Sequence, residues 1–185
     1  FYSTADINAV INIGDVVGSA WLNELASRSD LKIWIYGSEA DYGKLPDGVK
    51  NKCSAILFRD ISATAQGLGF KVQIDNEWHD LSMATVGEFN VQNANAVLAV
   101  LLASGLAVNK ALTMLSKVHS VPGRMEIINP NDDRHPLMVV DFAHTPDALK
   151  KSLEALLPIA QVRGGKLVCI FGCGGNRDAA KRPLM

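Results

Sequence analysis

The sequence of 185 residues contains no apolar run of the roughly 18 residues that a membrane-spanning helix requires. Its charges are nearly balanced and interspersed, with 18 Lys and Arg against 19 Asp and Glu, so no surface for nucleic acid is indicated. Two of its three cysteines, Cys169 and Cys173, lie on and just after one predicted strand, where a structural disulfide is not expected. These features argue against membrane insertion and nucleic-acid binding, and they predict a protein of the reducing cytoplasm.

Several common site patterns are also missing. No Gly-x-Gly-x-x-Gly follows the first predicted strand, which argues against a NAD-dependent dehydrogenase. The glycine loop at 172–178 is neither a Walker A sequence nor a dinucleotide fingerprint. The pair Cys169 and Cys173 has no second pair of ligands, so no zinc site is predicted. What remains is a chain that is 48% hydrophobic and long enough for one good core or two smaller domains.

The most informative residues follow two predicted strands near the end of the sequence. A strand at Leu137–Phe142 contains Asp141 and is followed by His144. A second strand at Lys166–Phe171 is followed by the glycine loop, which contains Arg177. A helix that a proline opens lies between them, and strand, helix and strand over about 35 residues predict a parallel βαβ unit. Because ligands of open α/β sheets bind outside the carboxyl ends of strands, we expect these polar side chains to surround one crevice.

The remaining pattern predicts an α/β fold in two domains. Another βαβ unit begins the chain, and an antiparallel meander and two helices follow it. Asp75-Asn76 predicts a tight turn within the meander. The further predicted strands are Ala9–Ile13, Leu31–Tyr36, Ser54–Phe58, Gly69–Ile74, Glu77–Leu81 and Arg124–Ile128, and the helices are Val16–Arg28, Asn93–Ser104, Asn109–Val118 and Ala148–Leu157. A proline and a glycine in the linker Ser120–Arg124 place a boundary near Val121. The predicted domains are therefore residues 1–121 and 122–185.

Each candidate side chain also has a plain structural interpretation. Asp141 could cap a turn rather than hold a ribose hydroxyl or a metal-bound water, and His144 could be an ordinary loop histidine. Asn90 and Asn93 are of the type favoured at helix N-caps, and Arg124 could be a surface cation. The glycine loop could be a bare turn, although backbone N–H groups near a helix N-terminus, with the cations that follow, favour an anion. The order of the motifs along the chain is more informative than any one of them.

That order resembles the Mur ligase family of amide ligases. The matching segments are Ala9–Gly18, Gly87-Glu-Phe-Asn-Val-Gln-Asn93, Val121-Pro-Gly-Arg-Met-Glu126, Val140-Asp-Phe-Ala-His-Thr-Pro-Asp-Ala148 and Phe171–Met185. They span nearly the whole chain, and the last two are highly specific. Two positions depart from the family pattern, since Gly14 stands where relatives often have Asp and Phe142 where Tyr is usual.

The resemblance implies a ligase that uses ATP and Mg²⁺ to phosphorylate a substrate carboxylate, after which an amine attacks the acyl phosphate. By this resemblance Asn93 would face adenine, Asp141 would hold the ribose and Arg124 would bind the phosphates. Arg177 would bind the carboxylate of the incoming amino acid. His144 is the one candidate for a catalytic role, which stays unassigned, and no metal ligand is expected among these 185 residues.

The form of the glycine loop, Gly172-Cys-Gly-Gly-Asn-Arg-Asp178, resembles enzymes that add meso-diaminopimelate rather than L-lysine to UDP-N-acetylmuramoyl-L-alanyl-D-glutamate, the UDP-muramoyl-dipeptide. The chain would form the end of a Rossmann-like central ATPase domain and the start of a second Rossmann-like domain. We expect a piece of a longer protein, because Phe1 is not an initiator Met and a predicted helix is only beginning at Met185. The family's Walker A loop, Mg²⁺-binding acids, carbamylated lysine and UDP-binding domain would precede Phe1, so these residues alone should be inactive.

Three alternatives stay open besides this one. The protein could be the homologue that adds L-lysine, or another ligase of the superfamily such as folylpolyglutamate synthase. The latter resembles Asp-Gly-Ala-His-Asn-Pro at the corresponding strand end, and Asp141-Phe-Ala-His-Thr-Pro146 argues against it. From a different class, the chain could be a non-catalytic nucleotide-binding module, which a missing Walker A loop in the full-length gene would favour.

Overall fold

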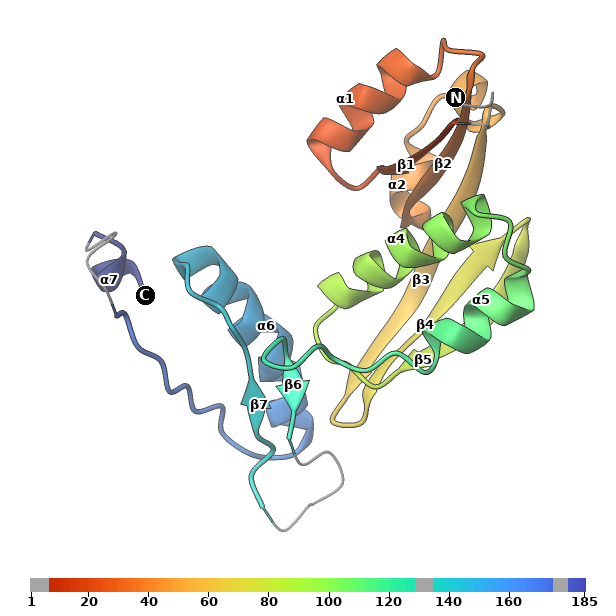
Figure 1. Cartoon of the computed structure of the whole chain (residues 1–185). Coiled ribbons are helices and arrows are strands. Elements are labelled where there is room, and N and C mark those ends of the chain that lie inside the picture. Colours follow the sequence, from red (N-terminus) through yellow and green to blue (C-terminus); the bar gives the residue numbers. More distant parts are fainter. Residues whose placement is uncertain (1–6, 129–134, 175–179) are drawn as a thin grey trace, which may run out of the picture. The chain divides into compact units, whose positions relative to one another are not determined.

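A computed structural model describes residues 7–128, 135–174 and 180–185 (Figure 1). The described chain divides into two compact units. Unit 1 comprises the residues up to Ser62 together with Gly69–Met83 and Phe89–Val118. Unit 2 comprises Ala63–Leu68, Ala84–Glu88 and His119–Met185. In the described residues, no helix is both long and apolar enough to cross a bilayer.

A five-stranded sheet forms the framework of unit 1, in the order β1-β2-β3-β4-β5 (Figure 1). Its strands are β1 (Ile7–Asn12), β2 (Leu31–Ser38), β3 (Cys53–Thr64), β4 (Gly67–Ile74) and β5 (Glu77–Met83). The first three are parallel, with Ile11 opposite Ile35 and Ile35 opposite Ala55. Turns of two residues join β3 to β4 and β4 to β5, and such short turns connect antiparallel strands. The predicted mixed α/β class with a meander is confirmed.

The turn between β4 and β5 shows how local chemistry sets the meander. Asp75 and Asn76 have φ of 49° and 66°, so both adopt the left-handed region. A two-residue hairpin turn with positive φ at both positions matches the twist of the flanking strands, and Asp and Asn tolerate that conformation better than most residues. The tight turn predicted at these two residues is confirmed.

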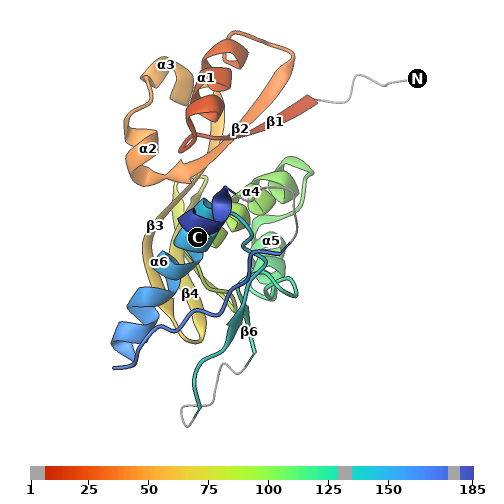
Figure 2. The same cartoon turned by 90° about the vertical axis from the view of Figure 1, so that its left-hand side faces the viewer.

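Side chains on both faces of the parallel strands are covered. On one face, Ile11, Ile33 and Ile35 share a core with Leu22 of α1 (Val16–Leu25). The short helices α2 (Glu39–Gly43) and α3 (Asp47–Lys50) gather with α1 at the β1–β2 end of the sheet (Figure 2). The other face meets α4 (Phe89–Ala103), which packs on β1 and β2 and in turn against α5 (Val108–Leu115). Because both faces are covered, these parallel strands are nearly continuous apolar runs rather than alternating ones.

Helix α1 approaches β1 unusually closely. A Cβ atom on Gly18 would lie 2.0 Å from the carbonyl oxygen of Asn12, which is shorter than any contact a real side chain makes. Only glycine allows this approach. At the start of the same helix, Asp15 is the N-cap, and its carboxylate accepts hydrogen bonds from the N–H groups of Val17 and Gly18.

Unit 2 is built on a small antiparallel ladder and one long helix. Strand β6 (Glu126–Ile127) pairs with β7 (Val139–Val140), and α6 (Pro146–Val162) follows; α7 (Lys181–Leu184) ends the chain. Thr145 caps α6, its hydroxyl accepting from the N–H of Ala148 at 3.2 Å, and Pro146 occupies the first turn as predicted. The buried core of the unit is Ala65, Val86, Met125 and Ile159.

The predicted strand at Lys166–Phe171 is wrong. This segment forms no strand in the described residues, and β7 pairs antiparallel with β6 rather than parallel with it. Val168 and Ile170 are 78% and 97% exposed. An apolar run of the right composition becomes a strand only when a neighbouring strand accepts its hydrogen bonds. The described part of unit 2 provides no such neighbour.

Candidate functional site

The candidate side chains fall into three groups. Arg124, Asp141 and His144 all lie in unit 2. Asn93 lies on α4 in unit 1. Arg177 lies outside the described residues, as does most of the glycine loop, so its predicted role stays a prediction.

The backbone around Arg124 forms a tight turn. The N–H of Arg124 donates to the carbonyl of Val121 at 2.9 Å, and the N–H of Gly123 donates to Oε2 of Glu126 at 2.7 Å. Gly123 has φ of 71°, a conformation that glycine adopts without a steric penalty. The linker predicted from its proline and glycine is therefore an ordered turn that projects Arg124 outward.

Met125, the next residue, is held in an uncommon conformation. Its φ is 46°, which a residue with a side chain rarely adopts, and it is almost fully buried. Its N–H donates to Oδ1 of Asp141 at 3.2 Å, and its carbonyl accepts from the hydroxyl of Ser120 at 3.3 Å. A strained backbone of this kind persists only where its surroundings determine it, so Asp141 helps to fix the turn that carries Arg124.

Asp141 links three segments of unit 2. Besides the bond from Met125, its Oδ2 accepts from the hydroxyl of Ser152 on α6 at 2.6 Å. The Ser152 hydroxyl also lies 3.0 Å from the carbonyl of Ala148, but its single proton favours the shorter bond to the charged acceptor. Asp141 therefore joins distant segments rather than capping a local turn, which was the alternative interpretation. A carboxylate can accept about four hydrogen bonds, so it keeps acceptor capacity for a ligand hydroxyl.

Beside Asp141 lies a group of side chains that we call the Arg124 surface: Arg124, Phe142, His144 and Lys181. The guanidinium carbon of Arg124 lies 4.8 Å from the centre of the Phe142 ring, within cation–π range. The rings of Phe142 and His144 are 5.4 Å apart and tilted by 58°. Lys181 donates to the carbonyl of His144 at 3.2 Å. Among the described residues no carboxylate pairs with Arg124, so this surface suits an anion.

His144 is oriented by its own backbone neighbourhood. Its Nδ1 lies 3.0 Å from the carbonyl oxygen of Phe142, a distance that fits an Nδ1–H donor. In the neutral ring this bond leaves Nε2 as the acceptor. His144 is exposed, and its side chain makes no hydrogen bond to the carboxylate of Asp141 in the structure. The geometry therefore gives His144 an ordered place on the Arg124 surface without a partner for proton transfer.

Asn93 lies in a polar group at the start of α4. Because α4 begins at Phe89, Asn90 and Asn93 lie inside the helix, and the alternative that they are N-caps is wrong. The exposed Asn93 donates from Nδ2 to Oδ1 of Asn90 at 3.1 Å. Nearby in the sequence, Gln92 accepts from Nδ2 of Asn12, at the carboxyl end of β1, at 3.4 Å. Ligands of open α/β sheets bind at such strand ends.

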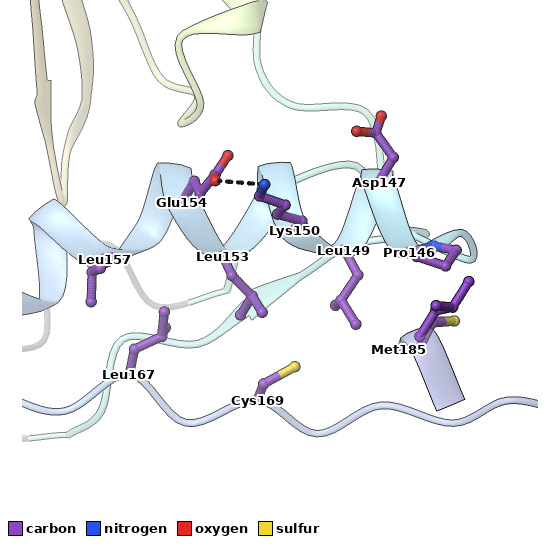
Figure 3. Close-up of a pocket in the computed structure, with 11 residues that line it drawn as sticks. Pro146, Asp147, Leu149, Lys150, Leu153, Glu154, Leu157, Leu167, Cys169 and Met185 are labelled. Carbon is purple, nitrogen blue, oxygen red and sulfur yellow. Dashed lines mark ion pairs between the residues drawn. The ribbon is translucent and has the colours of Figure 1, made fainter. Parts of the chain in front are cut away.

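A groove of unit 2 lies elsewhere. It has a volume of about 780 Å³ and lies between α6 and the extended segment that contains Leu167 and Cys169 (Figure 3). Leu149, Leu153 and Leu157 point from α6 towards that segment, whereas Lys150 and Glu154 form an ion pair of 3.8 Å on the other side of the helix (Figure 3). Its lining is mainly apolar, and none of the predicted site residues contributes to it. The groove therefore exposes apolar side chains of α6 and lies apart from the described candidate residues.

Sequence reasoning missed two residues that organise this site, Ser152 and Phe142. Ser152 is buried on α6, and no local sequence pattern predicts its hydrogen bond to Asp141. Lys181 is one of the cations expected after the glycine loop, whereas Phe142 lies inside a matching motif only as a departure from the family. Its spacing could have indicated its place on the Arg124 surface, because residues two apart in an extended segment, such as Phe142 and His144, project to the same side.

In the described residues, no group of three or more His, Cys, Asp or Glu side chains gathers as metal ligands would. All three cysteines are free, and burial raises the pKa of the Cys53 thiol, which makes it a weaker nucleophile. Among the described residues, therefore, neither a cluster of metal ligands nor the Cys53 thiol competes with the Arg124 surface as the candidate site.

Comparisons with known proteins agree with the motifs. Residues 123–185 match the family described as "Mur ligase, glutamate ligase domain". Over 178 residues the chain is 37% identical to the UDP-N-acetylmuramoyl-L-alanyl-D-glutamate--2,6-diaminopimelate ligase of Janthinobacterium sp. (strain Marseille), covering 96% of this chain and 34% of that ligase. Over 146 residues it is 42% identical to the ligase of the same name from Coxiella burnetii, covering 77% and 28%.

A solved structure of a UDP-N-acetylmuramoyl-L-alanyl-D-glutamate--2,6-diaminopimelate ligase is similar as well. It has a TM-score of 0.62 and 29% sequence identity, and the similarity covers 97% of this chain and 34% of that one. The chain thus spans about a third of the length of the curated relatives it matches. Similarity in sequence and fold extends through both units, and the motifs stand in the family's order. The chain belongs to the Mur ligase family.

Proposed function

We propose that this chain is part of an ATP-dependent amide ligase that adds meso-diaminopimelate to UDP-N-acetylmuramoyl-L-alanyl-D-glutamate in peptidoglycan synthesis. The observation that carries the proposal is an identity of 37% over 178 residues, in both units, to a ligase named for that reaction. The Arg124 surface supports it, because an arginine without a carboxylate partner beside a strand-end aspartate suits a ligand that has both phosphates and hydroxyls. In this proposal residues 1–121 end the central ATP-binding domain, and residues 122–185 begin the C-terminal domain.

Each candidate residue has a distinct role in the proposed enzyme. Asn93 binds adenine through its amide, and Asp141 accepts from ribose hydroxyls with the acceptor capacity that Met125 and Ser152 leave. Arg124 offers its N–H groups to the phosphates of ATP. Arg177 binds the carboxylate of diaminopimelate.

ATP and Mg²⁺ are the proposed cofactors of the whole enzyme. When bound, Mg²⁺ neutralises phosphate charge during transfer to the substrate carboxylate. The described residues contain no cluster of three or more metal-ligating side chains, so we derive no step through the ion from them. What these residues contribute is charge neutralisation by Arg124 and positioning by Asp141, which lower the barrier by holding ATP in a productive geometry.

The test is phosphate release by the full-length protein with ATP, Mg²⁺ and the UDP-muramoyl-dipeptide, with meso-diaminopimelate or L-lysine as acceptor. Release that only meso-diaminopimelate stimulates is the expected result. Stimulation by L-lysine instead would identify the lysine-adding homologue. No release with either acceptor, despite measurable ATP binding, would favour another ligase of the superfamily or a non-catalytic nucleotide-binding module.

A second measurement tests the proposed role of Arg177. In the full-length enzyme, Arg177→Ala should raise KM for diaminopimelate far more than KM for ATP, because its charge would bind only the amino acid. An unchanged KM for the amino acid would remove Arg177 from that site. The 185 residues without the rest of the protein should release no phosphate.

A further inference from the structure

We propose that Phe142 is a positioning residue for Arg124: its ring holds the guanidinium so that the N–H groups face the phosphates of ATP. The inference rests on the proposed function, because it takes Arg124 as a phosphate-binding residue. Phe142 touches no reacting atom in this proposal. It acts only through the arginine.

The first support is the geometry of the pair. The guanidinium carbon lies 4.8 Å from the ring centre, and the described residues give Arg124 no carboxylate partner. The ring is therefore the main side-chain contact that orients the guanidinium. A cation over an aromatic face keeps its N–H edges free, whereas an ion pair would occupy them.

The second support is the exposure of the ring. Phe142 is 61% exposed, and the small core of unit 2 does not include it. A large apolar side chain in that position contributes little to burial, so packing alone does not account for it. The Phe142 ring contacts the guanidinium of Arg124, and the ring of His144 lies 5.4 Å from it.

The third support is that Asp141 and Phe142, which are adjacent in the sequence, constrain the backbone and the guanidinium of Arg124. Asp141 accepts from the N–H of Met125 and thereby fixes the backbone next to Arg124. Phe142, the residue after Asp141, contacts the guanidinium at the other end of the side chain. A free arginine loses considerable rotamer entropy when it is ordered on a ligand, and holding it beforehand reduces that loss. An exposed cation–π contact corresponds to about a two- to five-fold gain in affinity.

The experiment is a double-mutant cycle in the full-length protein, with isothermal titration of a non-hydrolysable ATP analogue. Phe142→Leu keeps apolar bulk but removes the ring face, and it should weaken binding by about two- to five-fold. Phe142→Tyr keeps the face and should bind within about two-fold of the wild type. In an Arg124→Ala background, Phe142→Leu should have no further effect, because the residue through which it acts is gone.

Trp21→Leu is the matched control, since Trp21 is 60% exposed on α1 and no cation lies over its ring among the described residues. It should leave the affinity unchanged. The melting temperature and KM for diaminopimelate should be the same in wild type and Phe142→Leu, whereas a purely structural role for Phe142 would lower the first.

Two results would overturn the inference. One is unchanged affinity in Phe142→Leu. The other is equal weakening with and without Arg124, which would mean that the ring contacts the nucleotide directly. Failure of the proposed function looks different, because the wild type itself would then release no phosphate with either acceptor, whatever the affinities of the Phe142 variants for the ATP analogue.

Discussion

Ile35 in unit 1 and Ile170 in unit 2 are both flanked by apolar residues in extended segments, yet Ile35 is fully buried and Ile170 is 97% exposed. The difference lies in their neighbours. Strand β2 has a parallel strand on each side and helices over both faces, whereas the segment around Ile170 has no strand beside it in the described residues. Hydrophobicity makes a segment able to join a sheet, and hydrogen-bonding neighbours decide whether it does.

The largest expected effect tests this difference directly. In the 185-residue chain, Ile35→Ala should lower the free energy of unfolding by about 2–5 kcal/mol, because it removes methyl groups from a close-packed core. Ile170→Ala is the matched change in unit 2 and should cost less than about 0.5 kcal/mol. Urea unfolding followed by far-UV circular dichroism measures both. Equal losses at the two positions would show that Ile170 is buried in solution.

The two units also differ in how closely a helix packs against its neighbouring segment. In unit 1, α1 packs tightly on β1, whereas in unit 2 an open groove lies beside α6. Gly18→Ala places a Cβ atom where the structure has the Asn12 carbonyl, so α1 must move, at about 1–3 kcal/mol. The control is Gly43→Ala, where a Cβ atom meets nothing within 4 Å. Urea unfolding should show Gly43→Ala to be neutral or slightly stabilising, because alanine favours a helix more than glycine does. A similar loss in both variants would mean that the approach to the Asn12 carbonyl is not what makes Gly18→Ala unfavourable.

Unit 2 depends more on polar links, and Asp141 tests this. Asp141→Ala removes the acceptor for Met125 and Ser152 and should destabilise unit 2 by about 1–3 kcal/mol. Asp141→Asn keeps an acceptor oxygen and should lose less. Hydrogen exchange of the Met125 amide gives the local readout: it should accelerate strongly in Asp141→Ala and weakly in Asp141→Asn. Unaltered protection in Asp141→Ala would contradict the bond.

The smallest expected effect concerns a polar link in unit 1. Hydrogen bonds from Lys44 and Ser38 lower the pKa of Asp41. A lowered folded-state pKa contributes stability above the unfolded pKa of about 3.9, and this is lost as pH falls through the folded value. Asp41→Asn should therefore cost less than about 1 kcal/mol at pH 7, because the pair is near the surface. The free energies of unfolding of the wild type and Asp41→Asn, measured from pH 7 to pH 2, should converge at the acidic end. A constant difference between them would assign the effect to packing.

Local patterns predicted most of the fold where an element's own residues supply its stabilising contacts. The start of α6 followed from Pro146, and the turn between β4 and β5 followed from Asp75 and Asn76. Helix α4 begins at Phe89, four residues before the start predicted at Asn93. The strand predicted around Ile170 failed for the different reason that its partner would have to come from elsewhere.

The candidate site likewise has a part that the sequence predicted and a part that it did not. Arg124, Asp141 and His144 were identified from motifs, and the structure brings them into one unit. Their contacts were not predictable, because Asp141 bonds to residues 16 and 11 positions away in the chain. Nothing in the periodicity of a strand or helix specifies which residue will meet such a carboxylate.

By itself the sequence determined the α/β class, the parallel start and antiparallel end of the sheet in unit 1, and membership of the Mur ligase family. These depend on periodicity, turn chemistry and motif order, all of which are properties of neighbouring residues. Only the tertiary structure decided that Ile170 is left exposed, that Asp141 holds the turn of Met125, and that Phe142 lies against Arg124. Those outcomes depend on which distant segments meet, and a contact between distant segments is a property of the folded chain.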